Sequence, residues 1–461
     1  MTFAYWAYMK HLAIGLVAAL CAGEIFARSN SVGAAIDTYI QPYVRSGNLM
    51  GDVLVQRNGK VVFEKAYGFT DRERRVGNTN HTRFHIASMS MQFTAAAILR
   101  LADVGLIGLD DRVGDLVPAI DGANRISIRD LLTERSGLPD INALSDYNEI
   151  LRHRQTPASL VLRIGGGRLL FEPGSRFLHE EHSAYNVLAL IVERKTGLPF
   201  AAAVERLVFK PMGMPASGID DDSEPRGSHM ARGYAPEGAS GLKLANPIHW
   251  SAKTGNGSAY ATAADEARWV GELFHGDELS ASSRNAVIDS SIPVGYGWFK
   301  SLDKRFSETA YYMNGRAPGF ASFVLYLPNS RTTVVILSNV YSSATTTIGY
   351  DVAALSLGLP YKSFRVSDPA PGASELQTCT GSFLFGPDFY QVNAVLTSIV
   401  DGGELHLRWP SGEITSLIPV GRDRFIDRSY WVDVRIERNA SGRPLMLFYD
   451  RFQGKATAPG R

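Results

Sequence analysis

The sequence predicts an α+β domain followed by a small all-β domain. Strand-like runs lie near both ends of residues 32–363, and helical patterns fill the stretch between them. A sheet built from both ends of such a segment, with helices in the middle, suits an α+β domain. After a segment rich in Pro, Gly and Ala at 368–374, the pattern changes to short alternating strands. This change indicates a separate sandwich or barrel.

Two hairpins are predicted for the first domain. Val53–Val55 and Val61–Phe63 are apolar runs joined through Asn58-Gly59. Asn-Gly favours the two-residue turn in which both residues need a positive φ. Phe320–Leu327 and Thr333–Leu337 form the second pair of strands. The first domain should therefore receive two strands from each of its ends.

Three helices are predicted between these hairpins, because apolar residues recur three and four positions apart. Each helix carries an end signal, with glycine after the last turn or threonine before the first. The helices span Ser88–Val104 before Gly105, Tyr185–Lys195 before Gly197, and Ala263–Phe274 after Thr262.

The second domain is predicted over 377–461, after a linker at 364–376. Its strands alternate apolar and polar residues, and Ser-Gly pairs mark turns between them. The strands are Glu404–Trp409, Glu413–Ile418, Tyr430–Glu437 and Pro444–Tyr449.

The composition excludes several classes of protein. The chain has 461 residues, and its 47 Lys and Arg balance 46 Asp and Glu. This balance argues against a general nucleic-acid binder, which needs a strongly basic surface. The chain contains two cysteines, Cys21 and Cys379. A disulfide framework and a Cys-rich zinc site are therefore excluded, and no cofactor is expected.

The amino terminus is typical of a secretory signal peptide. Leu12–Cys21 is an apolar run after Lys10, and small residues follow it. The run is much shorter than the ~20 apolar residues of a membrane-spanning helix. Residues 1–27 are therefore predicted to be removed on export, which would leave a periplasmic or secreted protein without an integral membrane segment. An uncleaved anchor or a buried helix is the alternative interpretation.

Six ordered segments resemble the serine β-lactamase and penicillin-binding-protein superfamily, most closely its class C β-lactamase, esterase and D-aminopeptidase branch. The resemblance implies a β-lactamase/transpeptidase-like fold, with an antiparallel sheet flanked by helices and an all-helical region. The residues after the linker resemble the lipocalin-like β domain found in this branch. The segments are FHIASMSMQFTAAAILRLADVGLIGLDDRV, ISIRDLLTERSGLPD, FEPGSRF, SAYNVLALIVERKTG, NGSAYATAADEARWV and APGFASFVLYLPNSRTTVVILSN.

The resemblance places Ser88 at the nucleophile of the family's Ser-x-x-Lys motif. Met91 stands where that motif has lysine. A thioether carries no charge and has no titratable proton, so it cannot accept the serine proton. Ser88 is thus the candidate nucleophile without its usual base. A serine that only caps a helix is the alternative interpretation.

The family's Tyr-x-Asn motif, whose tyrosine assists proton transfer, falls on 179–182. Two alignments are possible there, and neither supplies a tyrosine. His182, Glu181 or Glu180 could replace it as the base for Ser88. His179 could line the pocket or, with His182, bind a metal. Two histidines three residues apart, without a clear third ligand, argue against a metal site.

The family's His-x-Gly or Lys-Thr-Gly motif falls on the segment from Met313 to Arg316. Met313 replaces the histidine, Gly315 is kept, and Arg316 could bring a positive charge. Met91 and Met313 together suggest a pocket that has become apolar. Lys195-Thr196-Gly197 and Lys253-Thr254-Gly255 also match the triplet, but three letters are weak evidence.

Two functions follow from these replacements. We expect a hydrolase relative with a degenerate site that binds a small molecule or peptide in its cleft, such as a cell-wall fragment. The alternative is an active esterase, amidase or peptidase that uses Ser88 with a base from the 179–182 loop. A base within hydrogen-bond reach of the serine oxygen distinguishes the two.

Overall fold

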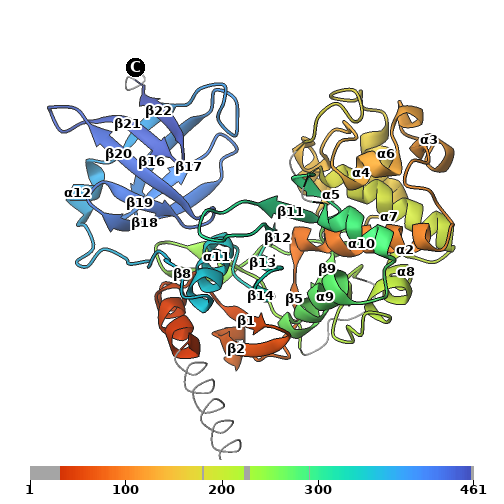
Figure 1. Cartoon of the computed structure of the whole chain (residues 1–461). Helices are drawn as coiled ribbons and strands as arrows, with labels where there is room; N and C mark the ends of the chain where they lie inside the picture. Colours follow the sequence, from red (N-terminus) through yellow and green to blue (C-terminus); the bar gives the residue numbers. More distant parts are fainter. Residues whose placement is uncertain (1–31, 179–180, 223–228, 290, 458–461) are drawn as a thin grey trace, which may run out of the picture.

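The computed structural model of the chain describes residues 32–178, 181–222, 229–289 and 291–457. The predicted signal peptide, His179 and Glu180 lie outside these residues. Figure 1 shows a mixed sheet-and-helix domain beside a carboxyl-terminal barrel. Within the described ranges, no helix has both the length and the apolar character needed to cross a bilayer.

A seven-stranded antiparallel sheet forms the centre of the first domain. Both ends of the domain contribute to it, because β1 pairs with β14 and places Val53 opposite Ile336. The predicted α+β class and both predicted hairpins are confirmed. In sheet order the strands are β10 (Val294–Gly295), β11 (Trp298–Ser301), β12 (Ala310–Ala317), β13 (Phe320–Leu327), β14 (Thr332–Ser338), β1 (Gly51–Arg57) and β2 (Lys60–Tyr67).

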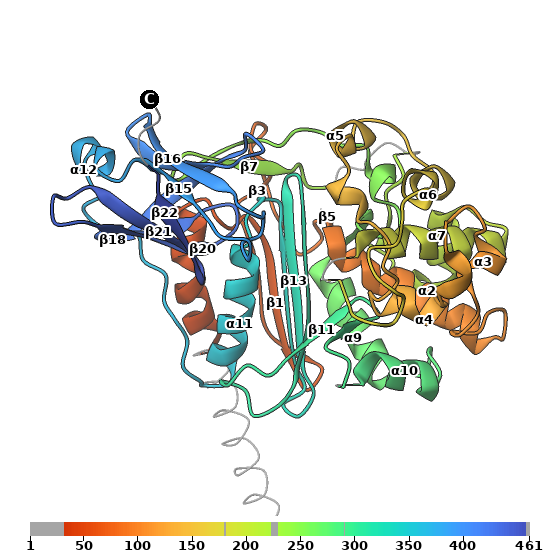
Figure 2. The ribbon, with the colours of Figure 1, turned by 90° about the horizontal axis from the view of Figure 1, so that it is seen from above.

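Strand β13 is buried along its whole length because both faces of the sheet are covered. Phe323 and Leu325 pack into the cluster under the amino-terminal helix at 32–45 and α11 (Ala344–Ser356). Val324 and Tyr326 point to the opposite face and join the largest hydrophobic cluster. Figure 2 shows these two helices on one side of the sheet and the helical region on the other.

The helical region packs around α2 (Met91–Asp103) and α7 (His182–Thr196). Gly105 and Gly197 have φ of 72° and 69°, as expected for residues that end helices. Thr262 caps α9 (Ala263–His275) by accepting a hydrogen bond from the Asp265 amide. The other helices of this region are α3 (Val113–Leu116), α4 (Ile128–Leu132), α5 (Tyr147–Ile150), α6 (Pro157–Gly165), α8 (Phe200–Val204) and α10 (Ala281–Ile288).

Short elements connect the sheet to the helical region. The three-stranded sheet β5–β9–β6 brings the chain just before Ser88 against residues 259–261. Its strands are β5 (Phe84–His85), β9 (Ala259–Ala261) and β6 (Gly218–Ile219), and the other short elements are β3 (Phe69–Asp71), β4 (Val76–Gly77), β7 (Tyr234–Glu237), β8 (Gly241–Leu244), η1 (Ala87–Ser90), η2 (Ala123–Arg125), η3 (Ile141–Ala143), η4 (Glu205–Phe209) and η5 (Trp250–Lys253).

The second domain is a closed eight-stranded barrel. Alternate residues of each strand point inward, and aromatic and aliphatic side chains fill the interior. A small all-β domain was predicted, and the barrel confirms it. The domain comprises α12 (Ala373–Gln377), β15 (Gly381–Leu384), β16 (Val395–Asp401), β17 (Glu404–Arg408), β18 (Ile414–Gly421), β19 (Arg424–Asp427), β20 (Val432–Arg438), β21 (Pro444–Tyr449) and β22 (Phe452–Ala456).

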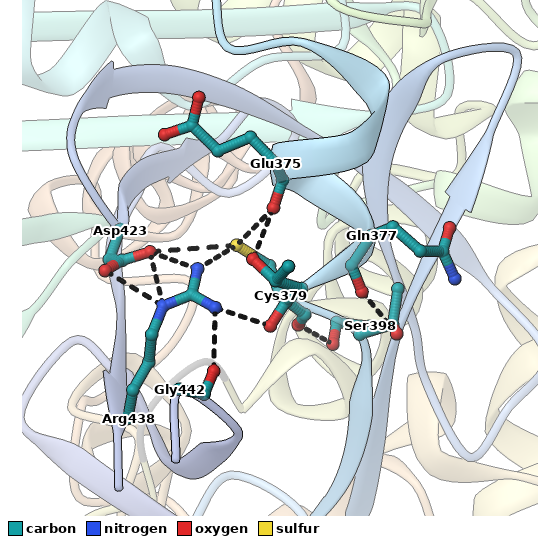
Figure 3. A network of polar contacts seen from close by, with 9 residues as sticks. Glu375, Gln377, Cys379, Ser398, Asp423, Arg438 and Gly442 are labelled. Atoms are coloured by element: carbon teal, nitrogen blue, oxygen red, sulfur yellow. Dashed lines mark hydrogen bonds and ion pairs between the residues drawn. The ribbon is translucent and has the colours of Figure 1, made fainter. Parts of the chain in front are cut away.

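The ion pair between Arg438 and Asp423 lies against the segment that leads into the first barrel strand. Arg438 contacts both carboxylate oxygens of Asp423 and donates to Cys379 Sγ at 3.0 Å (Figure 3). Arg438 holds the pKa of Asp423 below its usual range, whereas burial raises the pKa of the Cys379 thiol. The cysteine is buried and free of any disulfide. Its side chain packs in the hydrophobic cluster of the barrel.

Arg428 fixes the barrel to the first domain, and we call its contacts the Arg428 junction. Its side chain is fully buried, and Nε donates to Asn48 Oδ1 at 2.9 Å. The guanidinium also donates to the carbonyls of Gly47, Gly238 and Gly241 at 2.6–3.0 Å. Burial lowers the pKa of Arg428 to about 10. Neutral acceptors from the other domain thus surround a buried cation.

Candidate functional site

Ser88 lies on η1, the short turn that leads into α2. Ala87, just before it, has a φ of 50°, an uncommon conformation for a residue with a Cβ. Ser88 is partly exposed although the residues on both sides of it are buried. Ser90 is the N-cap residue of α2, and its side chain makes no capping hydrogen bond. Ser88 therefore does not serve as the helix cap that the alternative interpretation required.

Strand β12 runs directly beside η1. A Cβ on Gly315 would lie 2.2 Å from the Ile86 carbonyl oxygen and 2.9 Å from the Ser88 nitrogen. The glycine is thus required for the main chain of β12 to approach the Ser88 amide this closely. The pairing of β11 with β12 ends at Tyr312. From Met313 onward, the outer edge of β12 is free of a strand partner among the described residues and faces the turn that carries Ser88.

Met91 and Met313 supply no charge to this turn. Met91 has no exposed surface and Met313 is 2% exposed, and both pack in the largest hydrophobic cluster. Neither can accept a proton from Ser88, so the family's lysine and histidine positions have become part of the core. That the two methionines line a ligand pocket stays a prediction.

His182, the first residue of α7, brings a basic side chain into contact with Ser88. Its Nε2 lies 3.5 Å from Ser88 Oγ. Its Nδ1 lies 3.3 Å from Asp140 Oδ1 and 2.9 Å from the side-chain nitrogen of Asn142. The imidazole is 7% exposed. We call Ser88, His182, Asp140 and Asn142 the Ser88 cluster.

The residues on either side of His182 hold the cluster together. Ser183 Oγ donates to the Pro139 carbonyl at 2.6 Å and accepts from the Ile141 amide at 2.8 Å. Glu181 is fully buried and accepts hydrogen bonds from Ser136 and the Leu138 amide. Loop 136–142 is therefore attached to the start of α7 through both neighbours of the histidine.

Glu181 was predicted as a candidate base, and the structure gives its carboxylate a different set of contacts. Burial raises the pKa of Glu181 to about 7, although the donors from Ser136 and Leu138 oppose the rise. Its oxygens are occupied by the loop, and His182 is the side chain that reaches Ser88. Among the described residues, no three His, Cys, Asp or Glu side chains gather as a metal site would require.

Arg316 points toward the barrel. Its guanidinium lies between the rings of Tyr341 and Tyr430, 4.2 and 4.0 Å from their centroids. It also donates to the Ser429 carbonyl at 3.0 Å. The positive charge predicted near the site is therefore engaged in cation–π contacts that connect β12 to the barrel.

The two Lys-Thr-Gly triplets have separate positions. Lys195-Thr196-Gly197 forms the end of α7, with Gly197 as its cap. Lys253 is 8% exposed, and its ammonium group contacts the hydroxyl of Tyr147 and lies 5.0 Å from the centroid of that ring. Neither lysine has a contact with Ser88 among the described residues.

Asp140 and Asn142 were missed by the sequence analysis. They follow the segment that resembles the family's Ser-Gly-Leu element, but nothing in their spacing relates them to a histidine forty residues later. Polar residues clustered just after that element, Asp140 and Asn142 within three positions, are the signal that could have directed attention to them.

The family model described as Beta-lactamase matches residues 36–356. The chain belongs to this family. Protein flp of Staphylococcus aureus (strain MRSA252) is 26% identical over 329 residues, 68% of this chain and 64% of the relative. The chain thus spans less than two thirds of that relative's length.

Solved structures agree with the family. A penicillin-binding protein from Bacillus halodurans is 27% identical, has a TM-score of 0.60, and covers 70% of this chain and 98% of its own. An octameric penicillin-binding protein homologue from Pyrococcus abyssi, 20% identical with a TM-score of 0.63, covers 91% and 99%. The latter likeness concerns the fold alone. The β-lactamase-like fold expected from the resemblance is confirmed.

Proposed function

We propose that this β-lactamase relative is an active serine hydrolase that cleaves an ester or amide bond through Ser88, with His182 as general base. The observation that carries the proposal is the position of one imidazole between the Ser88 hydroxyl and the Asp140 carboxylate. Nucleophile, base and an acidic group that orients the base are the three parts of a serine-hydrolase triad. The proposal favours the second of the two predicted functions over the degenerate site.

The tautomer of His182 decides whether it can act as a base. When Nδ1 carries the proton and donates to Asp140, the lone pair of Nε2 faces Ser88 Oγ. Asn142 Oδ1 is buried and has no hydrogen-bond partner in the described chain. Turning this amide over would bring Oδ1 to the position near Nδ1, where it also accepts that proton. Both neighbours of Nδ1 can thus support the catalytic tautomer.

The proposed reaction is acyl transfer in two stages. Ser88 Oγ attacks the substrate carbonyl carbon while its proton moves to His182 Nε2. The Ser88 amide, beside the free edge of β12, is available to stabilise the resulting oxyanion. His182 then gives the proton to the leaving alcohol or amine. Water, deprotonated by the same imidazole, releases the acid from Ser88 in the second stage.

The substrates that we propose are small-molecule esters or peptide-like amides, the same classes that the sequence predicts. The resemblance to penicillin-binding proteins supports a peptide-like acyl donor, including one derived from the cell wall. The signal-like segment Leu12–Cys21 supports action outside the cytoplasm. These assignments are part of the same proposal.

Labelling with a fluorophosphonate, read by mass spectrometry of the Ser88 peptide, tests the proposal. We expect an adduct that Ser88→Ala abolishes. His182→Gln should slow labelling and p-nitrophenyl ester turnover by about 10²–10⁴-fold, the usual contribution of a general base. His153→Gln is the matched control, because the His153 side chain is 71% exposed and pairs only with Glu149 among the described residues.

Absence of both labelling and turnover in the folded protein would contradict the proposal and support a ligand-binding role. Labelling that His182→Gln leaves unchanged would mean that another group deprotonates Ser88. Labelling of the His153→Gln control should equal that of the unmodified protein.

A further inference from the structure

A cavity of about 280 Å³ lies at the junction of the two domains. It is bordered by the amino-terminal helix, by α11, by the segment that follows α11, and by barrel strands β18 to β20. Figure 2 shows the amino-terminal helix and α11 between the barrel and the sheet. The lining residues that matter most are Tyr43, Lys362, Phe364, Arg365, Arg424, Trp431 and Asp433.

Three aromatic rings form the apolar part of the cavity. Tyr43, Phe364 and Trp431 contact one another, with ring centroids 5.0–5.4 Å apart. Trp431 adopts a φ of 56°, a conformation that bulky residues rarely take and that surrounding structure must hold in place. Tyr43 and Phe364 are almost fully buried, so Trp431, which is partly exposed, provides most of the rigid apolar surface that a ligand can reach.

The charged part of the lining is predominantly positive. Its charged residues are Lys362, Arg365, Arg424 and one carboxylate, Asp433, and all four are exposed at the mouth of the cavity. Asp433 lies 3.9 Å from Lys362 Nζ and 4.0 Å from Arg424 Nη2, beyond hydrogen-bond distance. Arg365 has no ion pair or side-chain hydrogen bond in the described chain. The donors of two guanidinium groups are thus available to an anion.

This cavity is separate from the Ser88 cluster. Tyr43 and Phe364 belong to the hydrophobic cluster on the α11 face of the sheet. Met89 and Met91, on both sides of the η1–α2 boundary, belong to the cluster on the opposite face. The sheet therefore lies between the cavity and the nucleophile, and binding in one does not require the other.

We propose that the junction cavity binds a small organic carboxylate, with its apolar body against Tyr43, Phe364 and Trp431 and its carboxylate on Arg365 and Arg424. A guanidinium matches a carboxylate in a two-bond geometry, and the aromatic rings provide contacts for an apolar body. The ligand contacts both domains, so it binds to the docked arrangement of the barrel. The proposal does not rest on the hydrolase activity.

Isothermal titration calorimetry with 3-phenylpropionate and octanoate tests the proposal and separates an aromatic from an acyl ligand. We expect saturable binding of at least one acid with a stoichiometry of one. The neutral amide of the same acid should bind at least about tenfold more weakly, because it lacks the negative charge. The variant Arg365→Gln/Arg424→Gln should weaken acid binding by at least about tenfold. Arg408→Gln, an exposed arginine on β17, is the matched control.

Ser88→Ala should bind the acids as the unmodified protein does. A loss of binding in that variant would place the ligand in the Ser88 cluster and overturn the proposal. Equal affinity for acid and amide, an undiminished affinity in the double arginine variant, or no saturable heat at millimolar acid would each overturn it as well. None of these results depends on whether Ser88 is acylated.

Discussion

The Ser88 cluster and the Arg428 junction are both polar groups set in largely buried surroundings, but their contacts differ. Arg428 is fully buried and donates to four acceptors at 2.6–3.0 Å. In the Ser88 cluster, the contacts of His182 with Ser88 and Asp140 are 3.5 and 3.3 Å. Ser88 is also partly exposed. The hydrogen-bond donors of Arg428 have acceptors at normal distances. The Ser88 cluster has long contacts and an acceptor, Asn142 Oδ1, without a partner among the described residues.

This difference in hydrogen bonding indicates a different role for each region. A saturated buried cation fixes the positions of the two domains, since any movement would leave charge and carbonyls without partners. A cluster with long contacts and a free acceptor can form new bonds when a substrate arrives, as catalytic hydrogen bonds commonly tighten on binding. Saturation thus fits a structural role for Arg428, and the unused hydrogen-bonding capacity of the Ser88 cluster fits the hydrolase activity that we propose.

The largest effect on stability is expected when the fully hydrogen-bonded Arg428 side chain is replaced. Arg428→Met should lower the free energy of unfolding by about 3–5 kcal/mol, because the acceptors of the junction lose a buried partner. Urea unfolding followed by fluorescence measures the change. Arg408→Met, on the exposed part of β17, should change stability by less than about 0.5 kcal/mol. A loss below about 1 kcal/mol in Arg428→Met would mean that the junction does not hold the barrel.

Asp52 provides an unsatisfied buried group away from both regions. No side chain among the described residues donates a hydrogen bond to its carboxylate, and burial, with the nearby charge of Glu64, raises the pKa of Asp52 to about 7. Between about pH 4 and pH 7 the folded chain therefore binds a proton that the unfolded chain has released. Stability contributed by this group is lost as the pH rises through that window.

Asp52→Asn removes this titration. At pH 8 the variant should be more stable than the unmodified protein by about 2–3 kcal/mol, and at pH 4 the two should be nearly equal. Urea unfolding at both pH values measures the difference. An equal effect of the substitution at the two pH values would show that the carboxyl is solvated in the folded state.

The smallest effect is expected at Asp140, because Asn142 can take over part of its role. Asp140→Asn should reduce ester turnover by about tenfold, equivalent to about 1.4 kcal/mol, with little change in stability. Combining it with Asn142→Leu should reduce turnover by about a further tenfold, since the neutral amide oxygen at position 140 is then the one acceptor left to Nδ1 from this pair. Turnover unaffected in the double variant would remove Asp140 and Asn142 from the mechanism.

The fold was predictable because its main signals are local. The turn at Asn58-Gly59, the caps at Gly105, Gly197 and Thr262, and the continuous apolar run of β13 each depend on neighbouring residues. The amino-terminal strands and the closing hairpin then had to share a sheet, because both needed buried partners. The barrel followed from alternation after the linker, although its closure and its contact with the first domain did not.

The candidate site was predictable in part. Motif positions directed attention to Ser88 and His182, and the structure places these two side chains in contact. The support of His182 by Asp140 and Asn142 depends on loop 136–142 folding back onto α7 through Ser183. The contact of Arg316 with Tyr430 joins residues more than one hundred positions apart. Such pairings arise from tertiary packing, which no local pattern encodes.

The barrel rests on the strand that borders the nucleophile. Arg316 is clasped by Tyr341 and Tyr430 and directly follows Gly315, the residue that abuts the Ser88 amide. Tyr430 is a barrel residue, so the appended domain is one residue removed from the reacting centre. A chain shortened after α11 would keep every segment that resembles the family and lose the Tyr430 contact on that strand, so the proposed hydrolysis would depend on both domains.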